Sequence, residues 1–219
     1  CYSELINQLK KNKGSTSLKF REKMSRLAFG DTAYYDAVIS NYFNKFNNIN
    51  FPKRKILFTN LVENLRYGEN PHQIGAFYSQ NIENKLEQIH GKTLSYNNYS
   101  DIFAALTISK SLPKNTGTAI VKHGNPCGVS ALKNSFDSYK SALESDPISA
   151  FGGIVSCNYK ISQKLAQMLN KIFLEVIIAN GFDKKALKIL KLKKNVRLID
   201  SSKVTFNDIW KFNSVDNFT

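Results

Sequence analysis

Cysteine is scarce in this sequence. The three cysteines, Cys1, Cys127 and Cys157, are odd in number and scattered along the chain, which excludes the disulfide framework of a small secreted domain. We therefore expect a reducing, cytoplasmic compartment. Long apolar runs are also absent, since none approaches the roughly 18 residues of a membrane helix. The best candidate, IFLEVIIANGF, is short and contains Glu175, so no membrane partner is expected.

Arginine is scarce too, and this changes the interpretation of the net charge. The formal charge of +14 is typical of proteins that bind nucleic acid. However, 26 of the basic residues are Lys and only 5 are Arg, while Asn reaches 24. Base readout and phosphate forks prefer Arg, whereas enrichment in Lys and Asn indicates the codon bias of an AT-rich genome. We therefore expect no nucleic-acid partner, and keep a basic nucleic-acid-binding α/β module as the alternative function.

The remaining composition is that of an ordinary globular protein. The 219 residues are 42% apolar and 22% charged, which suffices to bury the core of one or two domains and excludes wholesale disorder. The sequence begins with Cys1 rather than Met, and no basic-then-apolar leader follows. We therefore expect a piece of a longer protein.

The first fifty residues predict a helical segment. YSELINQLKK at 2–11 is one expected helix, and 18–45 has apolar residues near i, i+3, i+4 spacing, which predicts a second. Ser15 or Ser17 is the expected N-cap of this second helix. The pattern slips at 30–32, where we expect a break or kink. An Asn-rich stretch that ends at Pro52 predicts a boundary between 1–50 and a domain over 51–219.

The remainder alternates β-rich runs with helices. Ile56, Phe58 and Leu61 suggest a strand or buried segment, and GAFY predicts a short strand. An apolar helix is expected over DIFAALTISKSL, with Ser100 or Asp101 as its N-cap. A strand over 118–121, a helix over SFDSYKSALES, a strand in IVSCN and two further helix–strand pairs follow. This order predicts a layered α/β domain with a partly parallel sheet.

The stretch VKHGNPCG at 121–128 gathers reactive side chains and admits several interpretations. Zinc deaminases of nucleobases pair His-x-Glu with Pro-Cys-x-x-Cys. Here Cys127 is followed by Gly, Val and Ser, and His123 by Gly and Asn. Both the catalytic Glu and the second Cys of that pattern are missing, so we expect no metal.

A cysteine nucleophile and a plain turn are the next two interpretations. Cys127 would need a base to form a thiolate, and His123 is four residues away across a turn that would allow contact. A small Cys packed under the turn is preferred. As a plain structural element, the stretch would be a strand-to-helix turn that starts at Asn125-Pro126, with Gly128 supplying a permissive φ.

A turn alone gives no reason for Lys122 and His123 at the end of a buried strand. Open α/β folds place their sites in loops at the carboxyl ends of strands. A neighbouring ammonium favours the neutral, basic form of an imidazole. This pair is therefore interpreted as a candidate for proton transfer.

Four motifs occur in one order: LRYGENPHQ at 65–73, LSYNNYSD at 94–101, VKHGNPCG at 121–128 and DPISAFGGIV at 146–155. Together they closely resemble the transformylase half of the bifunctional purine biosynthesis enzymes, in which phosphoribosylaminoimidazolecarboxamide formyltransferase is fused to IMP cyclohydrolase. Residues 18–43 resemble the helical segment that joins the two parts. The resemblance covers roughly residues 1–200. It implies a cytidine-deaminase-like α/β fold without zinc, of which 51–219 is the first half.

The resemblance also implies a reaction. Enzymes of this family transfer a formyl group from 10-formyltetrahydrofolate, a co-substrate, to the amine of 5-aminoimidazole-4-carboxamide ribotide (AICAR), and the full-length protein closes the ring to IMP. They work as homodimers with shared active sites. A piece that lacks the cyclohydrolase domain and the second transformylase half is expected to be inactive alone.

Site residues follow from the same resemblance. His123 matches the family's catalytic histidine and Lys122 its neighbouring lysine. The residues expected to contact the ribotide are Arg66, Tyr67, Asn98, Phe151 and Gly152. Asp146 and Ser149 are interpreted as supports of the loop that carries Phe151.

Overall fold

The structure is a computed structural model that describes residues 2–80 and 86–205. Cys1 and the end of the expected 51–219 domain lie outside the described residues. The chain divides into two compact units, with the division between Asn60 and Leu61. Each unit is described by itself, and the assignment of 1–50 as a segment between two domains stays a prediction.

The first unit contains two helices, α1 (Tyr2–Lys11) and α2 (Leu18–Phe46). Ser17 is the N-cap of α2, and its hydroxyl accepts the N–H of Phe20 at 3.2 Å, which confirms one of the two expected caps. The break or kink predicted at 30–32 is absent, because α2 is helical throughout. That prediction was wrong. The Thr32 hydroxyl donates to the Ala28 carbonyl at 2.8 Å, so this polar stretch is satisfied within the helix.

The segment after α2 packs on that helix instead of forming a strand. Asn41 Nδ2 donates to the Ile56 carbonyl at 2.9 Å, and the Phe58 ring meets Tyr34 edge-on with centroids 5.6 Å apart. Ile56 is 41% exposed. The strand or buried segment expected from Ile56, Phe58 and Leu61 was therefore wrong at Ile56 and Phe58, whereas Leu61 lies in the first strand, which begins at Asn60.

The second unit contains a small two-stranded sheet and a larger six-stranded one. The strands are β1 (Asn60–Leu65), β2 (Gly75–Ser79), β3 (Glu87–His90), β4 (Gly117–Lys122), β5 (Asn125–Ala131), β6 (Ile154–Cys157), β7 (Val176–Ala179) and β8 (Arg197–Asp200). The helices are α3 (Tyr96–Ser111), α4 (Ser135–Ser145), α5 (Gln163–Leu169) and α6 (Lys184–Leu190). β2 confirms the strand expected over GAFY.

The large sheet has the order β3-β8-β7-β6-β4-β5. β6, β7 and β8 are mutually parallel, whereas β3, β4 and β5 pair antiparallel with their neighbours. The sheet is therefore partly parallel, as the sequence predicted. β3 was not expected, because EQIH is short and largely polar.

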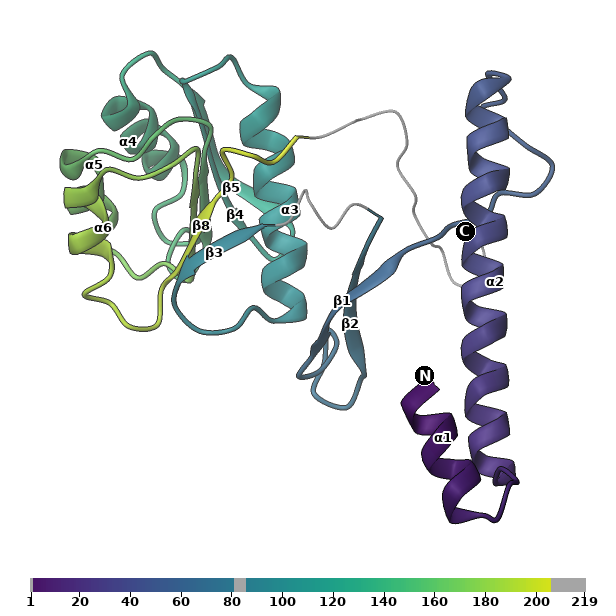
Figure 1. Ribbon diagram of the computed structural model, residues 1–219. Helices are drawn as coiled ribbons and strands as arrows, with labels where there is room; N and C mark the ends of the chain where they lie inside the picture. Colours follow the sequence, from purple (N-terminus) through teal and green to yellow (C-terminus); the bar gives the residue numbers. More distant parts are fainter. Residues whose placement is uncertain (1, 81–85, 206–219) are drawn as a thin grey trace. The chain divides into compact units, whose positions relative to one another are not determined.

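Helices cover both faces of this sheet, with α3 on one face and α4, α5 and α6 on the other (Figure 1). Side chains alternate between the two layers. Ile120 and Val155 pack in the core beneath α4 and α5, and their neighbours Val121 and Ile154 pack beneath α3. The predicted layered α/β class is confirmed.

Helix α3 begins earlier than the sequence indicated. Its N-cap is Ser95, whose hydroxyl accepts the Asn98 N–H at 3.2 Å while Asn98 Oδ1 accepts the Ser95 N–H at 3.2 Å. This reciprocal capping box satisfies two backbone donors at once. The expected caps Ser100 and Asp101 were wrong, because the helix already begins at Tyr96 and both residues lie within it.

Gly128 allows β5 and α4 to approach each other closely. A Cβ at this position would lie 1.8 Å from the Ala142 carbonyl oxygen, and Gly128 is not among the positive-φ glycines. The expected permissive φ was therefore wrong, and the role of this glycine is close packing.

Replacing Gly128 by Ala should destabilise the fold by about 1–3 kcal/mol, because backbone must move to accommodate the methyl group. Gly30→Ala is the matched control, since a Cβ at Gly30 meets nothing within 4 Å. That control should stabilise its helix by about 0.5–1 kcal/mol. Urea unfolding followed by circular dichroism measures both changes, and an unshifted Gly128→Ala midpoint would contradict the packing role.

Candidate functional site

The stretch VKHGNPCG forms a β-hairpin. β4 ends at Lys122 and β5 begins at Asn125, which pair across the ladder. His123 and Gly124 form the two-residue loop, with φ of 52° and 73°. Positive φ at both positions is the pattern of a type I′ turn, whose twist matches that of the flanking strands. The strand-to-helix turn was therefore wrong, since the chain continues as a strand through Ala131.

Asp101 of α3 holds this turn. Its Oδ1 accepts the Gly124 N–H at 2.6 Å and its Oδ2 accepts the His123 N–H at 3.3 Å. On the other side of the turn, Asn125 Nδ2 donates to the His123 carbonyl at 3.0 Å. The backbone of the turn is thus fixed from both sides, while the His123 side chain is exposed. No hydrogen bond to its imidazole occurs within residues 2–80 and 86–205.

Lys122 joins the hairpin to the loop before β6. Its Nζ donates to the Phe151 carbonyl at 2.8 Å. Gly152, with φ of 74°, donates its N–H to the Phe173 carbonyl at 2.8 Å. Phe151 is 59% exposed. Three residues expected at the site, Lys122, Phe151 and Gly152, therefore adjoin at one edge of the sheet.

The same loop has a support at its start. Asp146 accepts the Ser149 N–H at 2.9 Å, and hydrogen bonds from Ser149 lower the pKa of the Asp146 carboxyl. This is the supporting role that the sequence suggested for both residues.

Asn98 is nearly buried, with 4% exposure. Besides its part in the capping box, its Nδ2 donates to Glu175 Oε2 at 2.9 Å. Arg197 Nη1 lies 3.7 Å from the same Glu175 oxygen, and Arg197 Nε donates to the Thr93 carbonyl at 3.1 Å. In this structure the Asn98 amide is thus committed to neighbouring protein groups, and its expected contact with a nucleotide stays a prediction.

Sequence reasoning missed Glu175, Arg197 and the role of Asp101. Glu175 lies directly before the all-buried strand β7, and a carboxylate inside the apolar run IFLEVIIA was the available signal. Arg197 begins β8, with no comparable signal around it. Asp101 was noticed only as a helix cap.

Arg66 and Tyr67 directly follow β1. The guanidinium carbon of Arg66 lies 5.8 Å from the Tyr67 ring centroid. β2, which pairs with β1, is attached to α3 by a stack of Phe77 on Tyr99 with centroids 4.4 Å apart. Burial, followed by the negative charge of Glu63, raises the pKa of Tyr99. Among the described residues, no hydrogen bond or ion pair links Arg66 and Tyr67 to the hairpin.

Cys127 is half-buried and packs against the core beneath α4. Burial, followed by the negative charge of Asp146, raises the pKa of its thiol. A thiol with a raised pKa is a poor nucleophile at neutral pH, which favours the packing interpretation over the nucleophile.

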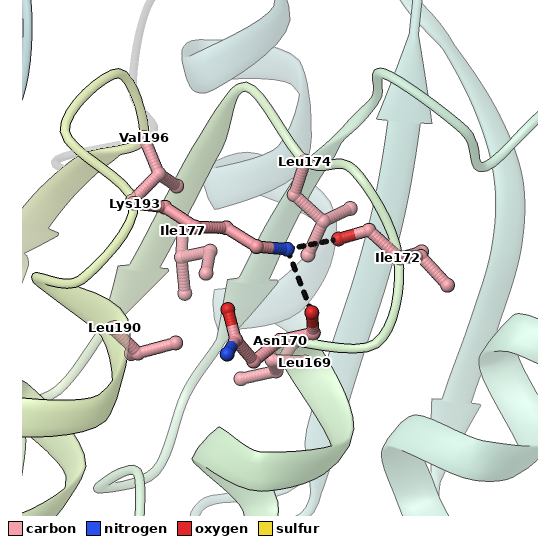
Figure 2. A pocket seen from close by; sticks show the side chains of 8 residues that line it. All are labelled: Leu169, Asn170, Ile172, Leu174, Ile177, Leu190, Lys193 and Val196. Atoms are coloured by element: carbon pink, nitrogen blue, oxygen red, sulfur yellow. Dashed lines mark hydrogen bonds between the residues drawn. The ribbon is translucent and has the colours of Figure 1, made fainter.

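Figure 2 shows a pocket between α5, α6 and β7 that none of the expected site residues lines. Lys193 Nζ donates to the carbonyls of Asn170 and Ile172 at 2.7 and 2.8 Å. Asn170 is the C-cap of α5, so Lys193 caps the carboxyl end of that helix. The other lining residues are apolar: Leu169, Leu174, Ile177, Leu190 and Val196. This pocket serves packing of the core.

The described residues offer neither a metal site nor a membrane-spanning helix. They contain no group of three or more His, Cys, Asp or Glu placed to hold a metal ion. No helix among them has both the length and the apolar character to cross a membrane.

The family model and the curated relatives that match this chain agree with each other. The family model described as AICARFT/IMPCHase bienzyme matches residues 1–217. The bifunctional purine biosynthesis protein PurH of Thermoanaerobacter sp. (strain X514) is 43% identical over 202 residues, which are 90% of this chain and 39% of that protein. PurH of Caldicellulosiruptor saccharolyticus is 41% identical over 218 residues, 95% of this chain and 42% of that protein.

Among solved structures, dCMP deaminase from the cyanophage S-TIM5 is similar at 13% identity and a TM-score of 0.35, over 46% of this chain and 93% of that one. A TM-score this low supports no argument about function. The chain spans about two fifths of the curated relatives, 39% and 42% of their lengths. The match of the family model over nearly all of its residues nevertheless shows that this chain belongs to the AICARFT/IMPCHase bienzyme family.

Proposed function

We propose that this chain supplies the first part of an AICAR transformylase. The enzyme would transfer a formyl group from 10-formyltetrahydrofolate to the 5-amino group of AICAR, in purine biosynthesis. Membership of the family supports this proposal. The observation that carries it is the hairpin that bears Lys122 and His123 at its turn and is joined to the Phe151 carbonyl by a hydrogen bond from Lys122 Nζ.

The chemistry needs a base and a positive charge. The amine of AICAR is a poor nucleophile, because its lone pair is delocalised into the imidazole and the carboxamide. Its nitrogen attacks the formyl carbon, and a tetrahedral oxyanion forms. When that intermediate collapses, the bond to N10 of the folate breaks, the amine's proton is passed on to N10, and tetrahydrofolate leaves. A positioned base and stabilisation of the oxyanion both lower this barrier.

His123 suits the role of the base. Its backbone is fixed at a turn on the sheet edge, and its exposed imidazole is available to receive the amine's proton. Lys122 suits the stabilisation of charge, because its ammonium is anchored by one hydrogen bond to the Phe151 carbonyl and retains two further N–H donors.

The other expected contacts concern the ribotide. Arg66 offers a forked set of donors for the phosphate, and Tyr67 can stack or donate a hydrogen bond. Phe151 and Gly152 would pack against the base. For Asn98, whose amide meets Glu175 in this structure, a nucleotide contact requires that amide to exchange partners.

The proposal extends to the whole protein. A full-length enzyme would be a cytoplasmic homodimer that also closes the ring to IMP, and this chain alone would lack formyl transfer because other catalytic groups are supplied by the rest. No metal is required in this scheme. No observation favours the nucleic-acid-binding alternative.

In a full-length enzyme, His123→Ala should reduce kcat by about 10²–10⁴-fold, the usual contribution of a general acid or base. Cys127→Ser is the matched control in the same hairpin and should retain most of the activity, because the thiol only packs. Release of tetrahydrofolate measures both. Loss of turnover in Cys127→Ser together with normal turnover in His123→Ala would reverse the two roles and refute the proposal.

Arg66→Ala should mainly raise KM for the ribotide and leave kcat nearly unchanged, because a phosphate contact is the same in ground and transition states. Steady-state kinetics with varied AICAR and saturating folate measures this separation. A fall in kcat at unchanged KM would show that Arg66 acts on the reacting atoms instead.

A further inference from the structure

The turn that presents His123 needs an external restraint. A side chain at φ of 52° adopts the left-handed region, where residues other than glycine are strained. Such a conformation persists only when the surroundings fix it, and it is often found at functional sites. Gly124 at φ of 73° has no such strain, so the restraint concerns His123.

Asp101 supplies that restraint with a carboxylate that its own helix does not require. Ser95 and Asn98 already cap the N-terminus of α3. Each oxygen of Asp101 instead accepts one N–H of the turn, from Gly124 at 2.6 Å and from His123 at 3.3 Å. A carboxylate that receives two neighbouring N–H groups fixes the orientation of the peptide plane between them, because both distances must be kept together.

The geometry of α3 makes this restraint stiff. Asp101 lies in the second turn of the helix, and the next residue, Ile102, is completely buried beneath it. Val121, which precedes Lys122, is buried in the same core layer. Both ends of the contact are therefore anchored in one packed layer, and the short polar bridge between them sets where the imidazole stands.

We propose that Asp101 is the positioning residue of His123: its carboxylate holds the strained turn and thereby aims the imidazole at the reacting amine. This inference rests on the proposed formyl transfer for its catalytic consequence, but not for its structural part. Asp101 itself touches no reacting atom.

The structural part is tested in the chain labelled with ¹⁵N-His and ¹⁵N-Gly, which contains only 3 His and 11 Gly and so gives a simple spectrum. Asp101→Asn keeps the shape but removes the charge and one acceptor. The amide protons of Gly124 and His123 should both shift upfield, since they lose a carboxylate partner. Asp137→Asn, the same change at an exposed position of α4, should leave both signals in place. Unchanged His123 and Gly124 signals in Asp101→Asn would overturn the proposal.

The catalytic part is tested in the full-length enzyme by a double-mutant cycle. Asp101→Asn should lower kcat on the order of 10²-fold, because small misplacements of a catalytic group have effects of this size. KM for the ribotide should stay nearly constant. On a His123→Ala background the same change should add almost nothing, because groups that act as a unit are not additive.

The outcomes separate the two claims. A full loss from Asp101→Asn on the His123→Ala background would show that Asp101 acts independently of His123, and would overturn the positioning role. Normal turnover of His123→Ala alone would instead refute the proposed function, while the amide signals would still decide whether Asp101 holds the turn.

Discussion

A helix leaves its first backbone N–H groups without intrahelical partners, and the way α3 meets this constraint organises the site. Ser95 and Asn98 satisfy the first turn reciprocally, and Asn98 still reaches Glu175 with its second polar atom. Asp101 lies beyond this cap, in the second turn of the helix, and binds the hairpin instead. Tyr99, between them, stacks on Phe77 of β2. Residues in the first two turns of one helix thus contact Glu175, strand β2 and the hairpin that carries Lys122 and His123.

The charged groups near the site each have their own, separate partners. The Lys122 ammonium is anchored on a neutral carbonyl, and Asp101 is occupied by backbone N–H groups. Arg197 and Glu175 form their own pair near Asn98. In these contacts the Lys122 side chain is not engaged by a carboxylate, which suits the proposed stabilisation of an oxyanion.

Much of the fold could be predicted from the sequence, because the buried strands are short apolar runs between helices of clear periodicity. The parallel part, β6 to β8, follows from that alternation. The start of α3 was missed because its first turn is polar and its cap depends on a reciprocal side-chain contact. The strand expected at Ile56 failed because Asn41 of α2 binds that backbone, a tertiary contact that no local pattern reveals.

The candidate site likewise contains residues that the sequence could predict and contacts that it could not. Lys122 and His123 could be singled out because two polar residues at the end of a buried strand have no packing role. The hairpin itself could not be predicted, because His-Gly is a less typical loop for a type I′ turn than Asn-Gly. The part played by Asp101 depends on a contact across 22 residues of sequence, and the part played by Glu175 on one across 77. Such partners become visible only once the sheet and α3 are packed.

Hydrogen exchange in the chain carrying Ser95→Ala tests most directly whether the first turns of α3 organise the site. Loss of a cap costs about 1 kcal/mol, which corresponds to roughly fivefold more frequent opening of the turn. If α3 holds the hairpin, exchange measured by mass spectrometry should accelerate in peptides covering 96–101 and also in those covering 122–125. Acceleration confined to 96–101, with the hairpin unchanged, would contradict the account.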